Sequence, residues 1–213
     1  MPNCSICKKM DQWIESNNDI LSEINYKIDC FYDLILGKYP KSYREDFYQE
    51  LINKFNTPEN VTHNDIEQAL RWKYGKKDNE GLAPNHINVI KDLSNGWVDY
   101  LVYLDKDTLT PQKSHEFWML KLDRKTAYIS VSYIVHLIHY QNDSIPIIDR
   151  FNWAATRYFL SLGGIKLPKK PSGFSHIMIL KQFIELLLIS DERRTFREID
   201  KYLMMFGKHV AQR

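Results

Sequence analysis

The sequence predicts an all-α fold, and three observations carry this prediction. Apolar residues recur at helical spacing along almost all of the 213 residues, and no sustained alternation of apolar and polar residues appears. Hydrophobic residues make up 44% of the chain, which is enough for a buried core. Capping residues and glycines stand where the apolar stripes begin and end. We therefore expect a compact bundle of helices, built as one domain or as two closely packed subdomains.

The apolar stripes of the first half predict four helices, which cover residues 20–35, 47–55, 62–72 and 85–104. Thr62 and Asp65 form a capping pattern that opens the third of them. The polar stretch 75–84 contains two glycines and predicts a loop. The sequence Ser-Asn-Gly at 94–96 can interrupt the fourth helix.

The second half predicts five helices, at residues 111–118, 124–140, 150–161, from about 175 onward, and 196–206. Gly163 and Gly164 stop the third of these, and Gly207 ends the last. Thr195 and Glu198 form a second capping box. Between the third and fourth helices, three lysines and two prolines make a stiff basic loop, with Lys166, Lys169 and Lys170 as its cations.

Net charge is only +2, but the charge is unevenly distributed. Residues 1–162 carry 19 Lys and Arg against 22 Asp and Glu, whereas residues 163–213 carry 10 against 5. This basic C-terminal quarter fits a localised contact with an anionic partner, and it also fits an ordinary solvated face. No apolar run is long enough to cross a bilayer and the N-terminus has no apolar signal region, so we expect a cytoplasmic chain.

Metal and cofactor signals are weak. Cys4 and Cys7 form a single CxxC, which is half of a zinc site, and the better interpretation is an incidental reduced pair. His136 and His139 stand three residues apart on a predicted helix, a spacing that packing explains more often than metal binding. Phosphate-binding and zinc-protease motifs are absent. We expect neither a metal nor a cofactor.

The most informative segment spans residues 123–159: a charged turn, a helix, the extended stretch 146–148, and Asp149 at the start of the next helix. Arg124-Lys125-Thr126-Ala127 resembles the end of the hairpin motif in helix-hairpin-helix DNA glycosylases, and residues 146–151 resemble the segment that bears their catalytic aspartate. The histidine-bearing helix before this segment, with His136, and residues 196–207 are similar to a divergent branch of that superfamily; residues 69–75 resemble an earlier helix.

This resemblance implies a compact, two-lobed helical domain over residues 1–213. Its N-terminal helices would cover about 8–105, the hairpin and aspartate region 110–162, and the C-terminal helices 172–210. It implies hydrolysis of the N-glycosidic bond of a modified or damaged base, with Asp149 as the catalytic carboxylate. Some relatives remove bulky modified cytosines from phage DNA, which makes such bases a candidate substrate. A catalytically inactive relative that binds DNA or protein is the alternative.

The site departs from the family pattern at two points. Lys125 stands where lyase members carry their nucleophile, but 24 residues before Asp149, a longer gap than is usual in the lyase branch. The catalytic lysine is therefore either Lys125, displaced, or missing; we favour the second and expect a monofunctional enzyme that uses water. The hairpin lacks its glycines, since Leu122-Asp123-Arg124 replaces them, so other groups must bind backbone phosphates. The expected phosphate contacts are Arg124, Lys125, Arg150, Lys166, Lys169 and Lys170. The expected partner is double-stranded DNA with one base flipped into a pocket of Tyr133, Trp153, Trp72 and His136, bound by a monomer.

Overall fold

The computed structural model contains helices and no strand within the residues that it describes. The described residues are 18–40, 43–76, 80–104, 110–122, 127–190 and 193–209. The prediction of an all-α fold is therefore confirmed for this part of the chain. Among its helices, none has both the length and the apolar character that a membrane span requires.

The chain divides into two compact units that interleave in sequence. One unit comprises the residues up to Tyr39 together with those from Pro146 onward, and the other comprises Pro40–Ile145. The first helix of the described residues therefore shares a unit with the last three of them. The single domain and the three consecutive sections expected from the sequence stay a prediction.

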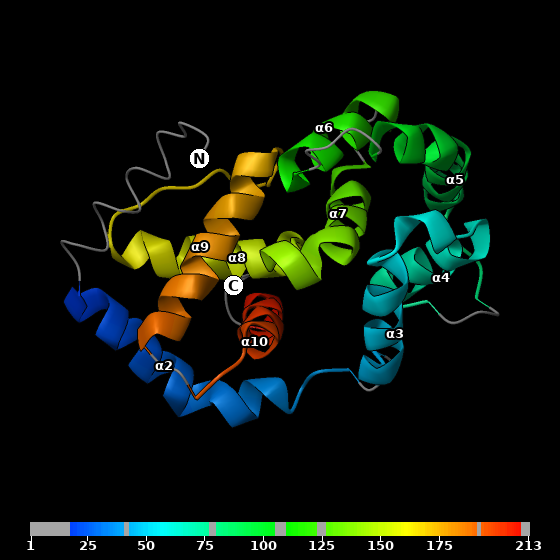
Figure 1. Cartoon of the computed structure of the whole chain (residues 1–213). Coiled ribbons are helices and arrows are strands. Elements are labelled where there is room, and N and C mark those ends of the chain that lie inside the picture. The colour runs from blue at the N-terminus through cyan, green and yellow to red at the C-terminus, as the bar shows by residue number, and fades with distance from the viewer. Residues whose placement is uncertain are drawn as a thin grey trace. The chain divides into compact units, whose positions relative to one another are not determined.

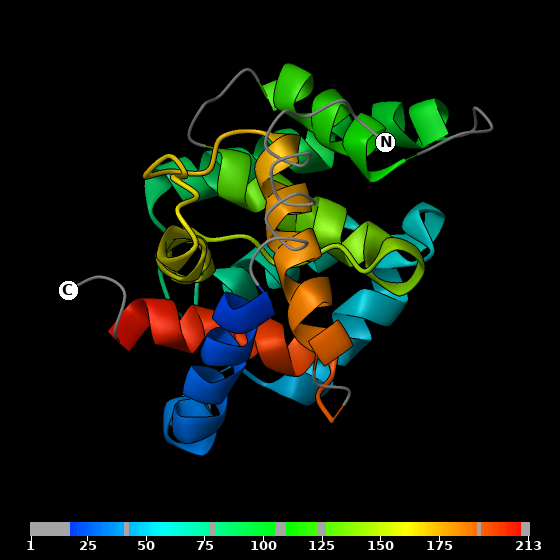
Figure 2. The same ribbon diagram turned by 90° about the vertical axis from the view of Figure 1, so that its left-hand side faces the viewer.

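The first unit is built from four helices, whose bounds are α2 (Asn18–Leu36), α8 (Arg150–Leu162), α9 (Phe174–Ser190) and α10 (Phe196–His209). Helix α10 packs against the other three and runs across α2 (Figures 1 and 2). Its buried rings Tyr202 and Phe206 stack on each other, and Phe206 also stacks on Phe159 of α8 at a centroid distance of 4.7 Å. Helix α10 is thus the central support of this unit.

Helix α10 approaches the start of α8 closely at Gly207. Gly207 lies against the backbone of Phe151, and a Cβ atom added at position 207 would overlap with the Phe151 carbonyl group. A collision with backbone cannot be relieved by rotating a side chain. The glycine predicted only to end α10 therefore stands inside the helix, where its missing side chain lets α10 reach the first turn of α8.

The second unit contains the other elements, whose bounds are α3 (Glu45–Phe55), η1 (Pro58–Asn60), α4 (His63–Lys73), α5 (Pro84–Leu104), α6 (Pro111–Leu122) and α7 (Tyr128–Asp143). Helix α7 packs against α3, α4 and α6. The sequence predicts one apolar face for α7, but every residue from Ser130 to His139 is buried. A helix buried on all sides must place its polar side chains on partners inside the protein.

Local signals locate most helix ends correctly. The Thr62–Asp65 capping box is present, and Thr195 and Glu198 exchange the expected pair of bonds at the start of α10. The expected interruption of α5 is wrong, because the helix continues through Gly96. A Cβ at that position would lie 3.0 Å from the ring of Trp118, so Gly96 admits the neighbouring helix α6 instead of breaking α5.

Gly207→Ala tests the contact between α10 and α8. We expect the variant to lose about 3 kcal/mol or more of unfolding free energy, because backbone must move to accommodate the methyl group. Gly173→Ala in the same unit is the control, since its added Cβ would meet only Ser175 Oγ at 3.9 Å. Urea denaturation measures both variants, and equal small losses would show that α10 does not approach α8 this closely.

A second prediction concerns His115 on α6, which is 4% exposed. Burial lowers its pKa from 6.5 to about 4. Between these two values the unfolded chain binds a proton that the folded chain does not, so stability falls as pH falls through this window and levels off below it. In His115→Gln we expect a shallower decline, by at most about 1.4 kcal/mol per pH unit. Identical pH dependence of urea unfolding in both proteins would contradict the burial of a neutral imidazole.

Candidate active site

Asp149 is the N-cap of α8, as the sequence predicts. Its Oδ1 atom accepts hydrogen bonds from the backbone N–H of Phe151 at 2.7 Å and of Asn152 at 3.1 Å. In return, Asn152 Oδ1 accepts the backbone N–H of Asp149 at 2.8 Å, which completes a capping box. The carboxylate is half-buried. Two N–H bonds and the positive end of the helix dipole fix its position.

Asn152 ties this cap to the protein interior. Its side chain is buried, and its amide nitrogen donates to the carbonyl of Ile147 in the extended stretch before the helix. The same nitrogen donates to Asp200 Oδ1 on α10 at 3.3 Å. The amide therefore fastens the cap residue, the segment that leads into it and the supporting helix to one another.

Asp200 is held in turn by a buried ion pair. Arg197 Nη1 donates to Asp200 Oδ2 at 3.0 Å, and the two side chains are 13% and 5% exposed. Arg197 Nη2 also donates to the hydroxyl of Tyr39 at 3.2 Å. Buried groups of this kind are expensive to leave unpaired, so the chain from Tyr39 to Asp149 forms one connected polar network.

The loop after α8 folds back along that helix. Gly164 adopts φ +81°, and Ile165 N–H donates to Leu160, which ends α8 where the two glycines predict. The loop carbonyls of Leu167 and Pro168 then accept bonds from Arg157 Nε at 3.3 Å and from Trp153 Nε1 at 2.9 Å. Successive loop residues thus pair with successively earlier helix residues. The loop returns toward the end of α8 that carries Asp149.

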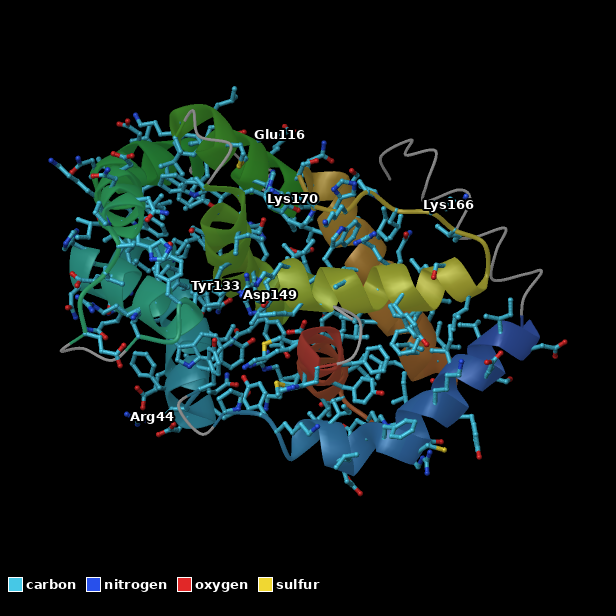
Figure 3. All side chains as sticks on the ribbon, turned by 180° about the vertical axis from the view of Figure 1, so that it is seen from behind. Arg44, Glu116, Tyr133, Asp149, Lys166 and Lys170 are labelled. Atoms are coloured by element: carbon cyan, nitrogen blue, oxygen red, sulfur yellow. The ribbon has the colours of Figure 1, made fainter. Side chains whose placement is uncertain are left out.

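The lysines of the expected phosphate contacts lie on this returning loop. Lys166, Lys169 and Lys170 are all exposed, and Figure 3 labels two of them together with Asp149. Lys169 and Lys170 follow Pro168, so the direction of the loop brings them back over the first half of α8. Arg150 is exposed and stacks over the ring of Phe151 at 4.5 Å. The site therefore combines one held carboxylate with several solvent-facing cations.

Trp153 is a core residue of the first unit. It is fully buried, its indole N–H is bonded to Pro168, and its ring lies 4.8 Å from that of His176. Burial lowers the pKa of His176, whose Nδ1 accepts the backbone N–H of Ser172 at 2.9 Å. A base could stack on Trp153 only if this packing opened, so its expected pocket role stays a prediction.

The other three expected pocket residues gather in the second unit. Trp72, Tyr133, His136 and Tyr48 form a closed ring of four stacked contacts, with centroid distances between 5.2 and 5.9 Å. His136 Nδ1 bonds the carbonyl of Ile145 and must carry the proton there, so in the neutral ring Nε2 accepts from the Tyr48 hydroxyl at 2.8 Å. All four are at most 8% exposed. The sequence missed Tyr48, whose place in this group depends on packing between α3 and α7.

The second unit also brings together a serine, a histidine and an aspartate. Ser114 Oγ lies 2.7 Å from His139 Nε2, and His139 Nδ1 lies 3.2 Å from Asp143 Oδ2. This is the order of groups in a nucleophilic triad. However, Ser114 is fully buried and accepts a hydrogen bond from the Tyr100 hydroxyl at 2.9 Å. A substrate cannot reach that oxygen, so the arrangement satisfies buried polar groups rather than performing acyl transfer.

Several residues of the sequence predictions lie outside the described residues. These are Cys4, Cys7 and the hairpin residues Asp123, Arg124, Lys125 and Thr126. The third cysteine, Cys30, is exposed on α2. Within the described part of the chain, no group of three or more His, Cys, Asp or Glu side chains is arranged to hold a metal ion.

Sequence reasoning missed Asn152, Asp200 and Arg197. Asn152 follows Asp149 by three residues, which is the spacing of a capping box and could have been noticed. Arg197 and Asp200 stand three apart on a helix, a common spacing for an ion pair. Their contact with Asn152, 48 residues away, leaves no local signal in the sequence.

Asp200→Asn tests the polar network. The variant keeps the shape of the side chain but leaves the Arg197 guanidinium without its buried counterion, so we expect a loss of about 3 kcal/mol in unfolding free energy. Asp46→Asn is the matched control, because it removes the same charge from an ion pair with Arg44 in which both side chains are 64% exposed. The control should lose less than about 1 kcal/mol. Similar losses in urea denaturation would contradict a buried, connected network.

The held carboxylate and the basic loop can together contact an anionic polymer and stabilise a developing positive charge. No family model, curated protein or solved structure matches the chain. The resemblance to helix-hairpin-helix glycosylases therefore rests on the residues that carry it, and it stays a prediction.

Proposed function

We propose that the protein is a DNA glycosylase of helix-hairpin-helix type, which hydrolyses the N-glycosidic bond of a modified or damaged base. One observation carries the proposal: the Asp149 carboxylate is half-buried and held by two N–H bonds at the start of α8. The basic loop that returns along the same helix supports it, because DNA binding requires cations near the reacting group.

The chemistry assigned to Asp149 is electrostatic. As the bond between C1′ and the base nitrogen breaks, its electron pair leaves with the base and positive charge develops on the sugar. A carboxylate about 4 Å away stabilises that charge by roughly 4 kcal/mol at an effective dielectric constant of 20. This corresponds to about a thousandfold in rate. Water then bonds to C1′ and releases a proton, which Asp149 can accept.

A rigid carboxylate is better suited to this task than a mobile one. The cap bonds and the Asn152–Asp200 contact keep Asp149 in one place, so little reorganisation is needed as charge develops. Its position as an N-cap therefore serves both the stability of α8 and the proposed reaction.

The pocket and phosphate contacts of the proposal follow the sequence predictions. The DNA backbone would be bound by the loop lysines and Arg150. The pocket predicted from the sequence, with Tyr133, Trp153, Trp72 and His136, would have to open before it could receive a base, because these side chains are at most 8% exposed. Water rather than Lys125 would be the nucleophile, so borohydride should trap no covalent adduct. Bulky modified cytosines of phage DNA are the proposed substrates.

A DNA-binding protein without catalytic activity is the second candidate. The capping box favours it, because stabilisation of α8 is by itself a sufficient reason for an aspartate at position 149. The two candidates differ in what the negative charge does, and a substitution that removes only the charge separates them.

Asp149→Asn is that substitution. Asparagine caps helices as well as aspartate does, so we expect unfolding free energy to change by less than about 0.5 kcal/mol. We expect the rate of base release to fall by about a thousandfold, while DNA affinity is retained. The assay incubates duplexes with modified or ordinary cytosines and counts abasic sites by alkaline cleavage.

Thr62→Ala is the matched control, because it removes a cap from α4 in the other unit. It should lose about 1 kcal/mol of stability and keep full activity. Binding without abasic sites in the unsubstituted protein would support the non-catalytic candidate. Equal release of modified and ordinary cytosine would reject the proposed substrate.

A further inference from the structure

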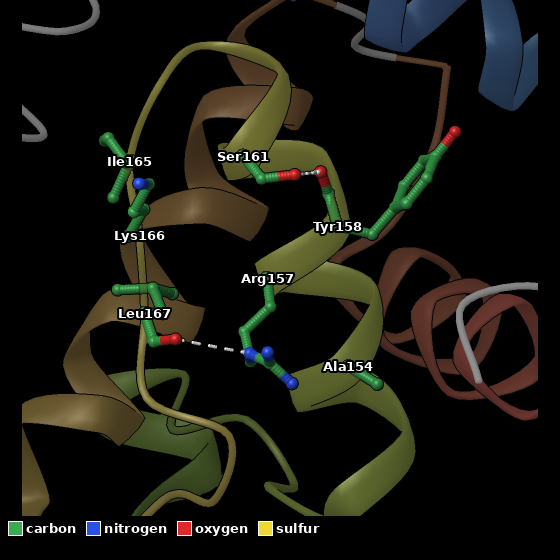
Figure 4. A pocket seen from close by; sticks show the side chains of 7 residues that line it. All are labelled: Ala154, Arg157, Tyr158, Ser161, Ile165, Lys166 and Leu167. Carbon is green, nitrogen blue, oxygen red and sulfur yellow. Dashed lines mark hydrogen bonds between the residues drawn. The ribbon is translucent and has the colours of Figure 1, made fainter. Parts of the chain in front are cut away.

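A half-open hollow of about 370 Å³ lies beside the second half of α8. One wall is formed by helix residues and the other by the first part of the returning loop, as Figure 4 shows. Its lining residues are Ala154, Arg157, Tyr158, Ser161, Ile165, Lys166 and Leu167. The small side chain of Ala154 leaves space where a longer residue would fill the hollow.

Two cations line this hollow, one from each wall. Arg157 is half-buried and extends from α8 toward the loop, where its Nε atom donates to the carbonyl of Leu167 at 3.3 Å (Figure 4). Lys166 is exposed and stands next to Leu167 in the loop. Within the described residues, neither Arg157 nor Lys166 has an acidic partner.

The guanidinium of Arg157 is positioned before any ligand arrives. Its bond to Leu167 occupies Nε and fixes the plane of the group, while the other two nitrogens make no hydrogen bond to the described residues. A fixed, planar pair of donors matches two oxygens of one phosphate. The ordering of a long side chain, which usually weakens binding, is largely complete in the unbound protein.

The C-terminal end of a helix carries partial negative charge, so the dipole of α8 disfavours the binding of an anion at that end. The loop reduces this effect, because Gly163 and Ile165 donate to the Leu160 carbonyl and Gly164 donates to Ser161. The remaining opposition is about 0.5 kcal/mol. A charge-assisted hydrogen bond contributes roughly three times as much, so two cations favour an anion here.

We propose that Arg157 and Lys166 form a phosphate site in this hollow, and that its ligand is a single phosphate group of a nucleic-acid backbone. The inference rests on the proposed function for the identity of the polymer, but not for the presence of the site. Inorganic phosphate offers the same oxygens, so the experiment separates the two sources.

The site is distinct from the reacting centre. Arg157 follows Asp149 by eight residues, which corresponds to about 12 Å along the helix axis. A phosphate bound there belongs to a nucleotide some distance along the strand from the base that is removed. The hollow would therefore set the position of the DNA on the protein, and it would not take part in bond cleavage.

The test measures binding of an unmodified duplex over a series of salt concentrations. We compare Arg157→Gln, Lys166→Gln and the double variant with Lys27→Gln, which removes one charge from a half-buried residue already paired with Glu23 at 2.8 Å. We expect each single variant to lose about tenfold or more in affinity. The slope of log K against log salt is negative, and its magnitude should decrease by about 0.9, as expected for one lost phosphate contact.

Because both cations bind one phosphate, the double variant should lose no more of the salt slope than either single variant. Titration with inorganic phosphate forms the second arm: if phosphate binds the unsubstituted protein and Lys27→Gln but neither site variant, the hollow also accepts the free ion. Within the described part of the chain Lys166 makes no hydrogen bond, so Lys166→Gln removes its charge without breaking a contact there. The proposal is overturned if both site variants match Lys27→Gln in both arms.

These measurements need no base release, so they are independent of the test of Asp149. If the protein releases base but the binding measurements detect no phosphate site, only the proposal for the hollow is rejected. If the phosphate site is detected but the protein releases no base, only the proposed glycosylase activity is rejected.

Discussion

The contact between Gly207 and the backbone of Phe151 is the constraint on which the rest of the first unit depends. It lets α10 lie against the first turn of α8, with no side chain between the two helices. At this separation the amide of Asn152 reaches Asp200, and Asp200 reaches Arg197. The position of Asp149 is therefore set by tertiary packing as well as by the bonds that every N-cap makes. A glycine on one helix fixes a carboxylate on another.

Helix α8 also determines the path of the loop that follows it. Arg157 and Trp153 bond to consecutive loop carbonyls, so the loop runs along α8 and carries its lysines with it. One helix thus organises a carboxylate at its start and a cationic hollow along its second half. Under the proposed function these two features divide the work: the carboxylate acts on the sugar, and the hollow holds the backbone. The closed aromatic group around His136 is a separate feature of the second unit.

Much of this fold could be predicted from the sequence, because helix ends depend on nearby residues. The boxes at Thr62 and Thr195, the stop at Gly164 and the cap at Asp149 are all local patterns. The burial of α7 on all sides could not be predicted. Its serines and histidines indicate a solvent-facing side unless their buried partners are known. The same is true of Gly96 and Gly207, which look like breaks in a helix and instead admit a neighbouring residue. The same holds for the candidate site: the Asp149 carboxylate could be predicted from the sequence, and the polar network that supports it could not.

In the proposed reaction, the Asp149 carboxylate faces the sugar of an extruded nucleotide. The most direct measurement is a crystal structure of the protein bound to a duplex that carries a cationic sugar analogue at the target position. We expect the cationic ring to contact the carboxylate of Asp149, with a backbone phosphate between Arg157 and Lys166. A complex in which the duplex is bound with every nucleotide stacked and Asp149 away from the DNA would contradict it.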